Sequence, residues 1–136
     1  ATLIDNYIFT VSLEGYLVII EKSSGIIIRM TDLFVQLKNK KKIALLTDKK
    51  YNPLYMFSKT KKKKTSIDKP SFKPTGFIVG KNNIYLSTDH GRLFIIDVAT
   101  GITKKIMKID NGKISRPAVL NKSLFIIKDN SIIKLN

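Results

Sequence analysis

The chain has 136 residues and is 43% hydrophobic, which predicts a packed domain or a part of a larger one. It has no cysteine and one histidine, so disulfides and thiolate chemistry are excluded, and a histidine metal cluster or catalytic triad is not expected. The formal net charge is +15, but residues 38–73 hold 13 lysines against Asp48 and Asp68, leaving only +4 elsewhere.

The first predicted unit begins with a short strand at Leu3-Ile4 and continues as YIFTVSLEGYLVIIEKSSG over residues 7–25. Runs rich in β-branched and aromatic residues flank Gly15 and predict two further strands. EKSSG then predicts a turn closed by Gly25, and residues 26–31 a fourth strand.

The second predicted unit, 34–75, is degenerate and rich in lysine. Its LLTDKKYNPLYMFSKTKKK places residues 54–57 where the first unit has residues 17–20. The lysine clusters KNKKK and KTKKKK are read as a solvated insertion or as contacts to a polyanion or an anionic membrane surface. The candidate contacts are Lys40, Lys41, Lys42, Lys61, Lys62, Lys63 and Lys64.

The third predicted unit contains NIYLSTDHGRLFIIDVATG over residues 83–101. Strands are predicted at 76–79, 84–88, 92–97 and 103–108. The turn residues are Asp89 and Gly91 in the hairpin, and Asp97 and Gly101 in the next turn. His90 is predicted to be an exposed turn residue rather than a ligand.

The fourth predicted unit has strands at 117–120, 123–128 and 131–135, and Asp129-Asn130-Ser131 replaces the hairpin turn of the third unit. Arg116 opens its first strand and is a further candidate for contact with a partner. Because this unit lacks an outer strand, the chain is expected to be the C-terminal part of a longer protein.

The first and third units repeat at an offset of 76 residues, which pairs Gly15 with Gly91, Leu17 with Leu93 and Gly25 with Gly101. A period of 38–40 residues is typical of four-stranded propeller blades. The predicted fold class is therefore all-β, a partial β-propeller of about three and a half antiparallel blades in a single domain. The predicted blades are residues 1–33, 34–75, 76–115 and 116–136.

The repeat resembles that of the quinoprotein-type (pyrroloquinoline quinone, PQQ) propellers: DHGRLFIIDVATG matches closely and LEGYLVIIEKSSG fairly. In function the nearest resemblance is to the propeller lipoprotein that assembles outer-membrane β-barrel proteins. That resemblance implies a non-enzymatic, cofactor-free interaction scaffold at the periplasmic face of the bacterial outer membrane. The chain departs from the PQQ repeat where a tryptophan is usual, since Ile27 and Lys104-Lys105 stand there.

The leading functional prediction is a protein-binding scaffold that is not an enzyme, because no catalytic constellation is visible and the acids fall at turn positions. One alternative is part of a PQQ-dependent dehydrogenase whose site lies in an absent half. The other is polyanion or membrane-surface binding through the lysines; nucleic acid is not an expected partner. Because an isolated part of a ring exposes two apolar blade faces, self-association or N-terminal blades that complete the ring are also expected.

Overall fold

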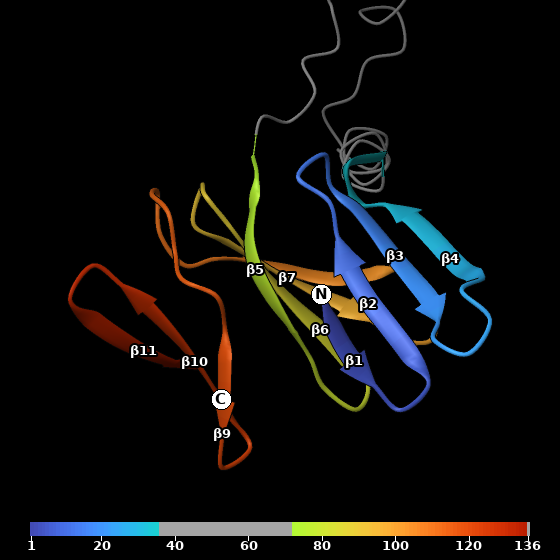
Figure 1. Cartoon of the computed structure of the whole chain (residues 1–136). Helices are drawn as coiled ribbons and strands as arrows, with labels where there is room; N and C mark the ends of the chain where they lie inside the picture. The colour runs from blue at the N-terminus through green and yellow to red at the C-terminus, as the bar shows by residue number, and fades with distance from the viewer. Residues whose placement is uncertain (36–71, 136) are drawn as a thin grey trace, which may run out of the picture. The chain divides into compact units, whose positions relative to one another are not determined.

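The computed structural model describes residues 1–35 and 72–135. The chain divides into two compact units, residues 1–33 with 72–136 and residues 34–71, and the first of these is described below. Its described residues form three antiparallel sheets of three or four strands (Figure 1). The predicted blade at 34–75 lies almost entirely outside the described residues, although its last two residues begin a strand of the next sheet.

Each four-stranded sheet is a simple up-and-down meander. The first sheet contains β1 (Thr2–Ile4), β2 (Tyr7–Val11), β3 (Tyr16–Glu21) and β4 (Ile27–Asp32). The second contains β5 (Pro74–Val79), β6 (Asn83–Thr88), β7 (Arg92–Asp97) and β8 (Thr103–Lys108). The third contains β9 (Ala118–Leu120), β10 (Ser123–Lys128) and β11 (Ser131–Leu135), with β10 in the middle.

The structure confirms the all-β, partial-propeller prediction, since 16–21 and 92–97 are the third strands of two equivalent sheets. Several strand bounds differ from the prediction by one or two residues, and one predicted turn residue lies in a strand. β5 starts two residues early, at Pro74, and β9 starts one residue late, at Ala118. In the last hairpin Ser131 does not act as a turn residue: it already pairs with Lys128, while Asp129 takes a positive φ of 49°.

The 76-residue repeat extends to individual hydrogen bonds and irregularities. The N–H of Gly25 donates to the carbonyl of Glu21 over 2.8 Å, and that of Gly101 donates to the carbonyl of Asp97 over 2.9 Å. The ladder slips by one residue between Ile19 and Ile20 in the first sheet and at the equivalent step of the second sheet. A bulge that recurs in this way is a structural feature of the repeat, not an accident of one copy.

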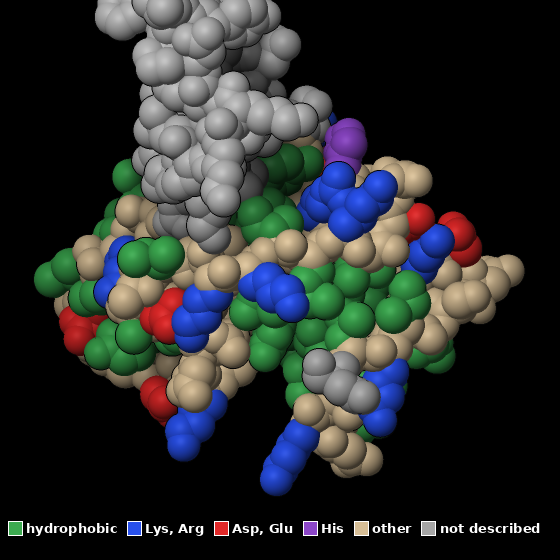
Figure 2. All heavy atoms as spheres, turned by 180° about the vertical axis from the view of Figure 1, so that it is seen from behind, with side chains coloured by type: hydrophobic (Ala, Val, Ile, Leu, Met, Phe, Trp, Pro, Cys, Tyr) green, Lys and Arg blue, Asp and Glu red, His purple; other side chains and the backbone are tan. Residues whose placement is uncertain are grey.

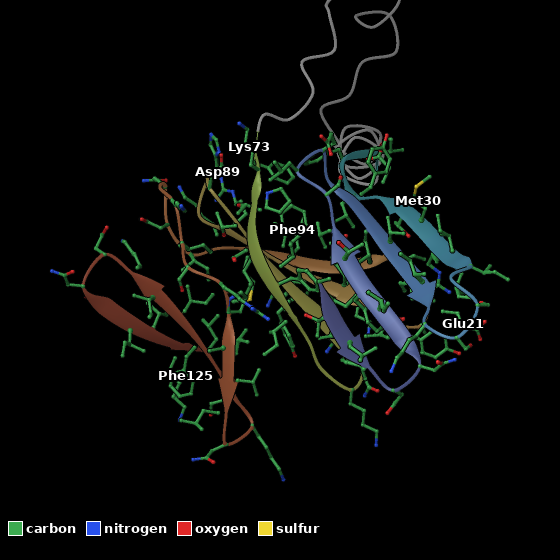
Figure 3. All side chains as sticks on the ribbon, in the orientation of Figure 1. Glu21, Met30, Lys73, Asp89, Phe94 and Phe125 are labelled. Carbon is green, nitrogen blue, oxygen red and sulfur yellow. The ribbon has the colours of Figure 1, made fainter. Side chains whose placement is uncertain are left out.

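The second sheet packs against the other two with opposite faces. Its face with Leu93 forms a buried cluster with Ile114 and with Leu124 and Ile126 of β10. On the other side, the Arg29 guanidinium of β4 donates to the carbonyl of Val98 over 3.1 Å, and β2 contacts β5. The sheets on either side of the predicted 34–75 blade are thus in direct contact, with Phe94 buried between them (Figure 3).

Candidate interaction pocket

A pocket of about 380 Å³ lies where the first and second sheets meet, at the end of the sheets that carries the β1–β2 and β5–β6 turns. Its walls come from both sheets, and the volume falls in the range of pockets that take small ligands or single side chains of a partner. The lining residues are Ile4, Asp5, Tyr7, Phe9, Val79, Gly80, Lys81 and Val98.

The apolar base of the pocket follows from the strand pattern. Ile4 pairs with Tyr7 across β1 and β2, so both side chains lie on the same face as Phe9, two residues further along β2. Phe9 is buried, whereas Tyr7 keeps 42% of its surface exposed. The pocket therefore has a fixed apolar base and one aromatic side chain that solvent can reach.

Two opposite charges stand at the mouth. Asp5 and Lys81 are both exposed, and within the described residues neither takes part in an ion pair or a side-chain hydrogen bond. They occupy the same position of the 76-residue repeat, one in each sheet. Because both charges are unpaired, a partner that places a base near Asp5 or an acid near Lys81 gains an ion pair without breaking one.

Backbone hydrogen bonds hold the two turns that carry Asp5 and Lys81. The N–H of Lys22 donates to the carbonyl of Asn6 over 2.8 Å, and that of Val98 donates to the carbonyl of Asn82 over 3.1 Å. Each bond ties the first turn of a sheet to the third turn of the same sheet, which joins its last two strands. The pocket mouth is thus held by the same device in both copies of the repeat.

The predicted turn residues lie in the turns between strands, except Asp97, which is the last residue of β7 and begins the turn. Gly15, Gly25, Gly91 and Gly101 all have positive φ values, of 87°, 70°, 64° and 72°. Asp97 accepts hydrogen bonds from the backbone and hydroxyl of Thr100 and pairs with Lys104 over 2.6 Å. The Lys104 ammonium and the Thr100 N–H lower the pKa of Asp97 to about 2.

Asp89 and His90 lie in the hairpin turn at the opposite end of the second sheet from the pocket. Asp89 accepts from the N–H of Lys73 over 2.7 Å and contacts the ring nitrogen Nδ1 of His90, also over 2.7 Å; Figure 3 shows Lys73 beside Asp89. Partial burial raises the pKa of Asp89, but the hydrogen bonds from His90 and Lys73 outweigh it and leave the pKa below its usual range. The hydrogen bond between Lys73 and Asp89 fixes the chain just before the start of β5.

Arg116, which precedes β9 of the third sheet, contacts the second sheet. Its Nε donates to the carbonyl of Phe77 in β5 over 3.0 Å. The Cβ that any other residue would have at Gly76 would lie 2.6 Å from the Cβ of Arg116, so a glycine is needed there for the close approach. The guanidinium is exposed at the surface but is already engaged with the backbone.

The seven candidate lysines, from Lys40 to Lys64, lie outside the described residues, so polyanion binding stays a prediction. Among the described residues, no group of three or more acidic or histidine side chains is placed to hold a metal ion. In that same part of the chain, no helix is long and apolar enough to cross a membrane.

The sequence analysis missed the pocket because it compared only the residues that the two copies of the repeat have in common. Ile4, Phe9 and Val79 read as ordinary core residues of strands, and Asp5 and Lys81 as turn residues. The available signal was the difference between copies: an acid in one unit and a base in the other at one repeat position.

No protein-family profile matches the chain, and no curated protein sequence does. Among solved structures it is similar to the β-propeller domain of Cps50 (Swd1) from Myceliophteria thermophila, with a TM-score of 0.54 and 14% identity. The match covers 89% of this chain and 34% of that one, so the chain spans about a third of its structural neighbour. At this identity the likeness shows the fold alone, a β-propeller.

Proposed function

We propose that this chain is a non-enzymatic protein-interaction scaffold that binds an extended peptide segment of a partner in the pocket between its first two described sheets. The observation that carries the proposal is the pocket itself, with an apolar base, one exposed aromatic side chain and two unpaired opposite charges. An apolar side chain of the partner fills the base, and flanking charged residues meet Asp5 and Lys81.

The side chains that select the partner lie on the turns at one end of the sheets. Loops and turns at one end of stacked sheets present several side chains at fixed spacing without needing catalytic groups. Tyrosine residues such as Tyr7 are common among the few interface residues that contribute most of the binding free energy.

We also propose, on the match of DHGRLFIIDVATG to the PQQ-type repeat, that the chain works at the periplasmic face of a bacterial outer membrane as a scaffold for β-barrel assembly. Strands of such barrels alternate apolar and polar residues and carry aromatic residues near their ends. Segments of this kind suit a pocket that takes one apolar side chain between two charges.

The test is selection of short random peptides displayed on phage against the immobilised chain, followed by titration of the enriched peptides by fluorescence anisotropy. Enriched peptides are expected to carry an apolar residue next to a charge, and Tyr7→Ala is expected to weaken their binding about tenfold. Asp5→Asn, which tolerates the positive φ at this position, and Lys81→Gln are each expected to weaken it several-fold.

Tyr16→Ala is the matched control, since Tyr16 is 38% exposed but lies on the opposite face of the first sheet from the pocket. Peptides that bind all four variants as tightly as the wild type would overturn the pocket as the site. A second panel of alternating aromatic peptides, of the outer-membrane strand type, tests the proposed setting: binding no tighter than to scrambled versions would contradict it.

A further inference from the structure

The two faces of each sheet are not equivalent. We call them the leading and the trailing face and define each by residues at equivalent positions of the repeat. The leading face carries Leu17 in the first sheet, Leu93 in the second and Ile132 in the third. The trailing face carries Ile20 in the first sheet, Ile96 in the second and Leu124 in the third. These assignments follow from alternation along each strand and from the pairing register between strands.

Both contacts between the described sheets join a leading face to a trailing face. The leading face of the first sheet, with Phe9, lines the pocket together with Val79, which lies on the trailing face of the second sheet. The leading face of the second sheet, with Leu93, packs on Leu124 and Ile126 of the third sheet's trailing face. One kind of interface is thus used twice.

Two faces of these kinds have no sheet packed against them in the described part of the chain: the trailing face of the first sheet and the leading face of the third. On the trailing face of the first sheet, Met30 is 64% exposed, and Figure 3 shows it pointing away from the sheet. The apolar residues of this open trailing face are Leu3, Ile8, Tyr16, Val18, Ile20, Ile27 and Met30.

The leading face of the third sheet is the other open face. Ile132 is 72% exposed there, although the equivalent Leu93 of the second sheet is fully buried. The apolar residues of this open leading face are Ala118, Leu120, Phe125, Ile127 and Ile132. Figure 2 shows exposed groups of hydrophobic side chains on the rear of the molecule, with Lys and Arg side chains between them.

We propose that the open trailing face of the first sheet binds the open leading face of the third sheet of a second copy of this chain, head to tail. The contact continues the interface that already joins the sheets within one copy. Because the two surfaces differ, the contact is heterologous and propagates to a ring or an open chain of copies instead of stopping at a symmetric dimer.

The test uses two variants, each blocking one face at an exposed position: Met30→Asp on the trailing face and Ile132→Asp on the leading face. Sedimentation velocity of the wild-type chain is expected to show species larger than the 15.4 kDa monomer, and their proportion is expected to grow with concentration. Each variant alone is expected to remain monomeric or to lose most of its assembly. An equimolar mixture is expected to form a one-to-one complex of twice the monomer mass, because each variant retains one intact face.

Leu13→Asp is the matched control, since Leu13 is 69% exposed in the β2–β3 turn and lies on neither face, and it should assemble like the wild type. Circular dichroism and melting temperature check that all three variants fold. A wild-type chain that stays monomeric overturns the proposal. A mixture that stays monomeric overturns it too, because an intact trailing face and an intact leading face would then fail to bind each other. A variant that still dimerises alone would indicate contact between faces of one kind and would also contradict the proposal. Tyr7→Ala should leave the assembly unchanged, so failure here is distinguishable from failure of the peptide pocket.

Discussion

The first and second sheets are copies of one unit, yet their side chains are buried to different extents. Leu17 and Leu93, on the leading faces, are both fully buried. On the trailing faces Ile96 is fully buried, whereas the identical Ile20 is only partly so. The second sheet has a neighbour on each side and the first sheet only one among the described residues, so burial is decided by the neighbour and not by the repeat.

The comparison is tested most strongly at Phe94, which is buried on the trailing face of the second sheet and contacts Phe72 at a ring-centroid distance of 5.1 Å. Phe94→Ala is expected to lower the free energy of unfolding by about 3–5 kcal/mol because it leaves a cavity between two sheets. The equivalent Val18→Ala on the open face should cost about 1 kcal/mol. Urea unfolding of both variants measures the difference, and equal losses would contradict the one-sided packing of the first sheet.

The glycines that close the β3–β4 and β7–β8 turns give a second matched pair. Both have positive φ, so an alanine at either position costs about 1–2 kcal/mol of backbone strain. At Gly25 a new Cβ meets nothing within 4 Å, but at Gly101 it would lie 2.7 Å from the hydroxyl of Thr31 in the neighbouring sheet. Gly101→Ala is therefore expected to destabilise by about 1–3 kcal/mol more than Gly25→Ala. Similar melting temperatures for the two variants would show that the two sheets do not approach at this turn.

Arg29 and Lys105 occupy the same repeat position but differ in what they reach. Arg29 is partly buried and donates to the carbonyl of Val98, whereas Lys105 is exposed. Arg29→Met is expected to cost about 1–2 kcal/mol, since it removes a charged hydrogen bond between sheets. Lys105→Met should stay within about 0.5 kcal/mol of the wild type in the same unfolding assay. A larger loss of stability at Lys105 than at Arg29 would contradict the conclusion that β4, and not β8, makes the stabilising contact with a neighbouring sheet.

The sequence predicted the strands because alternation and turn chemistry are local properties. Residues 92–97 alternate between two faces, and the turn that follows runs from Asp97 to Gly101; a turn of this kind forms whatever packs on the sheet. The identity of the neighbour is not local. Nothing in the chemistry of Ile20 and Ile96 distinguishes the copy with a covered face from the copy with an open one.

The pocket escaped sequence prediction for a related reason. It joins Phe9 to Val79 across 70 residues, and the chain between them contains a lysine-rich segment that was read as an intervening blade. Arg116 was predicted as a candidate for contact with a partner because its sequence position opens a strand, and the sequence did not indicate that its guanidinium donates to the carbonyl of Phe77. Such contacts depend on which units are adjacent, and a repeat pattern does not encode adjacency.

The smallest expected effect concerns pH and again separates the two copies. Lys104 pairs with Asp97 in the second sheet, whereas Ile28 stands at that position in the first sheet, opposite the turn of Glu21. Because the folded-state pKa of Asp97 is lowered to about 2, its ionised form stabilises the fold above about pH 4, and this contribution is lost as the pH falls from about 4 through 2. Asp97→Asn and Lys104→Met should each flatten the fall of melting temperature over that range. Glu21→Gln, which removes no ion pair, is the control in the other copy. If Asp97→Asn melts with the same pH profile as the wild type, the Asp97–Lys104 pair does not distinguish the two turns in solution, and the difference between the copies lies in packing alone.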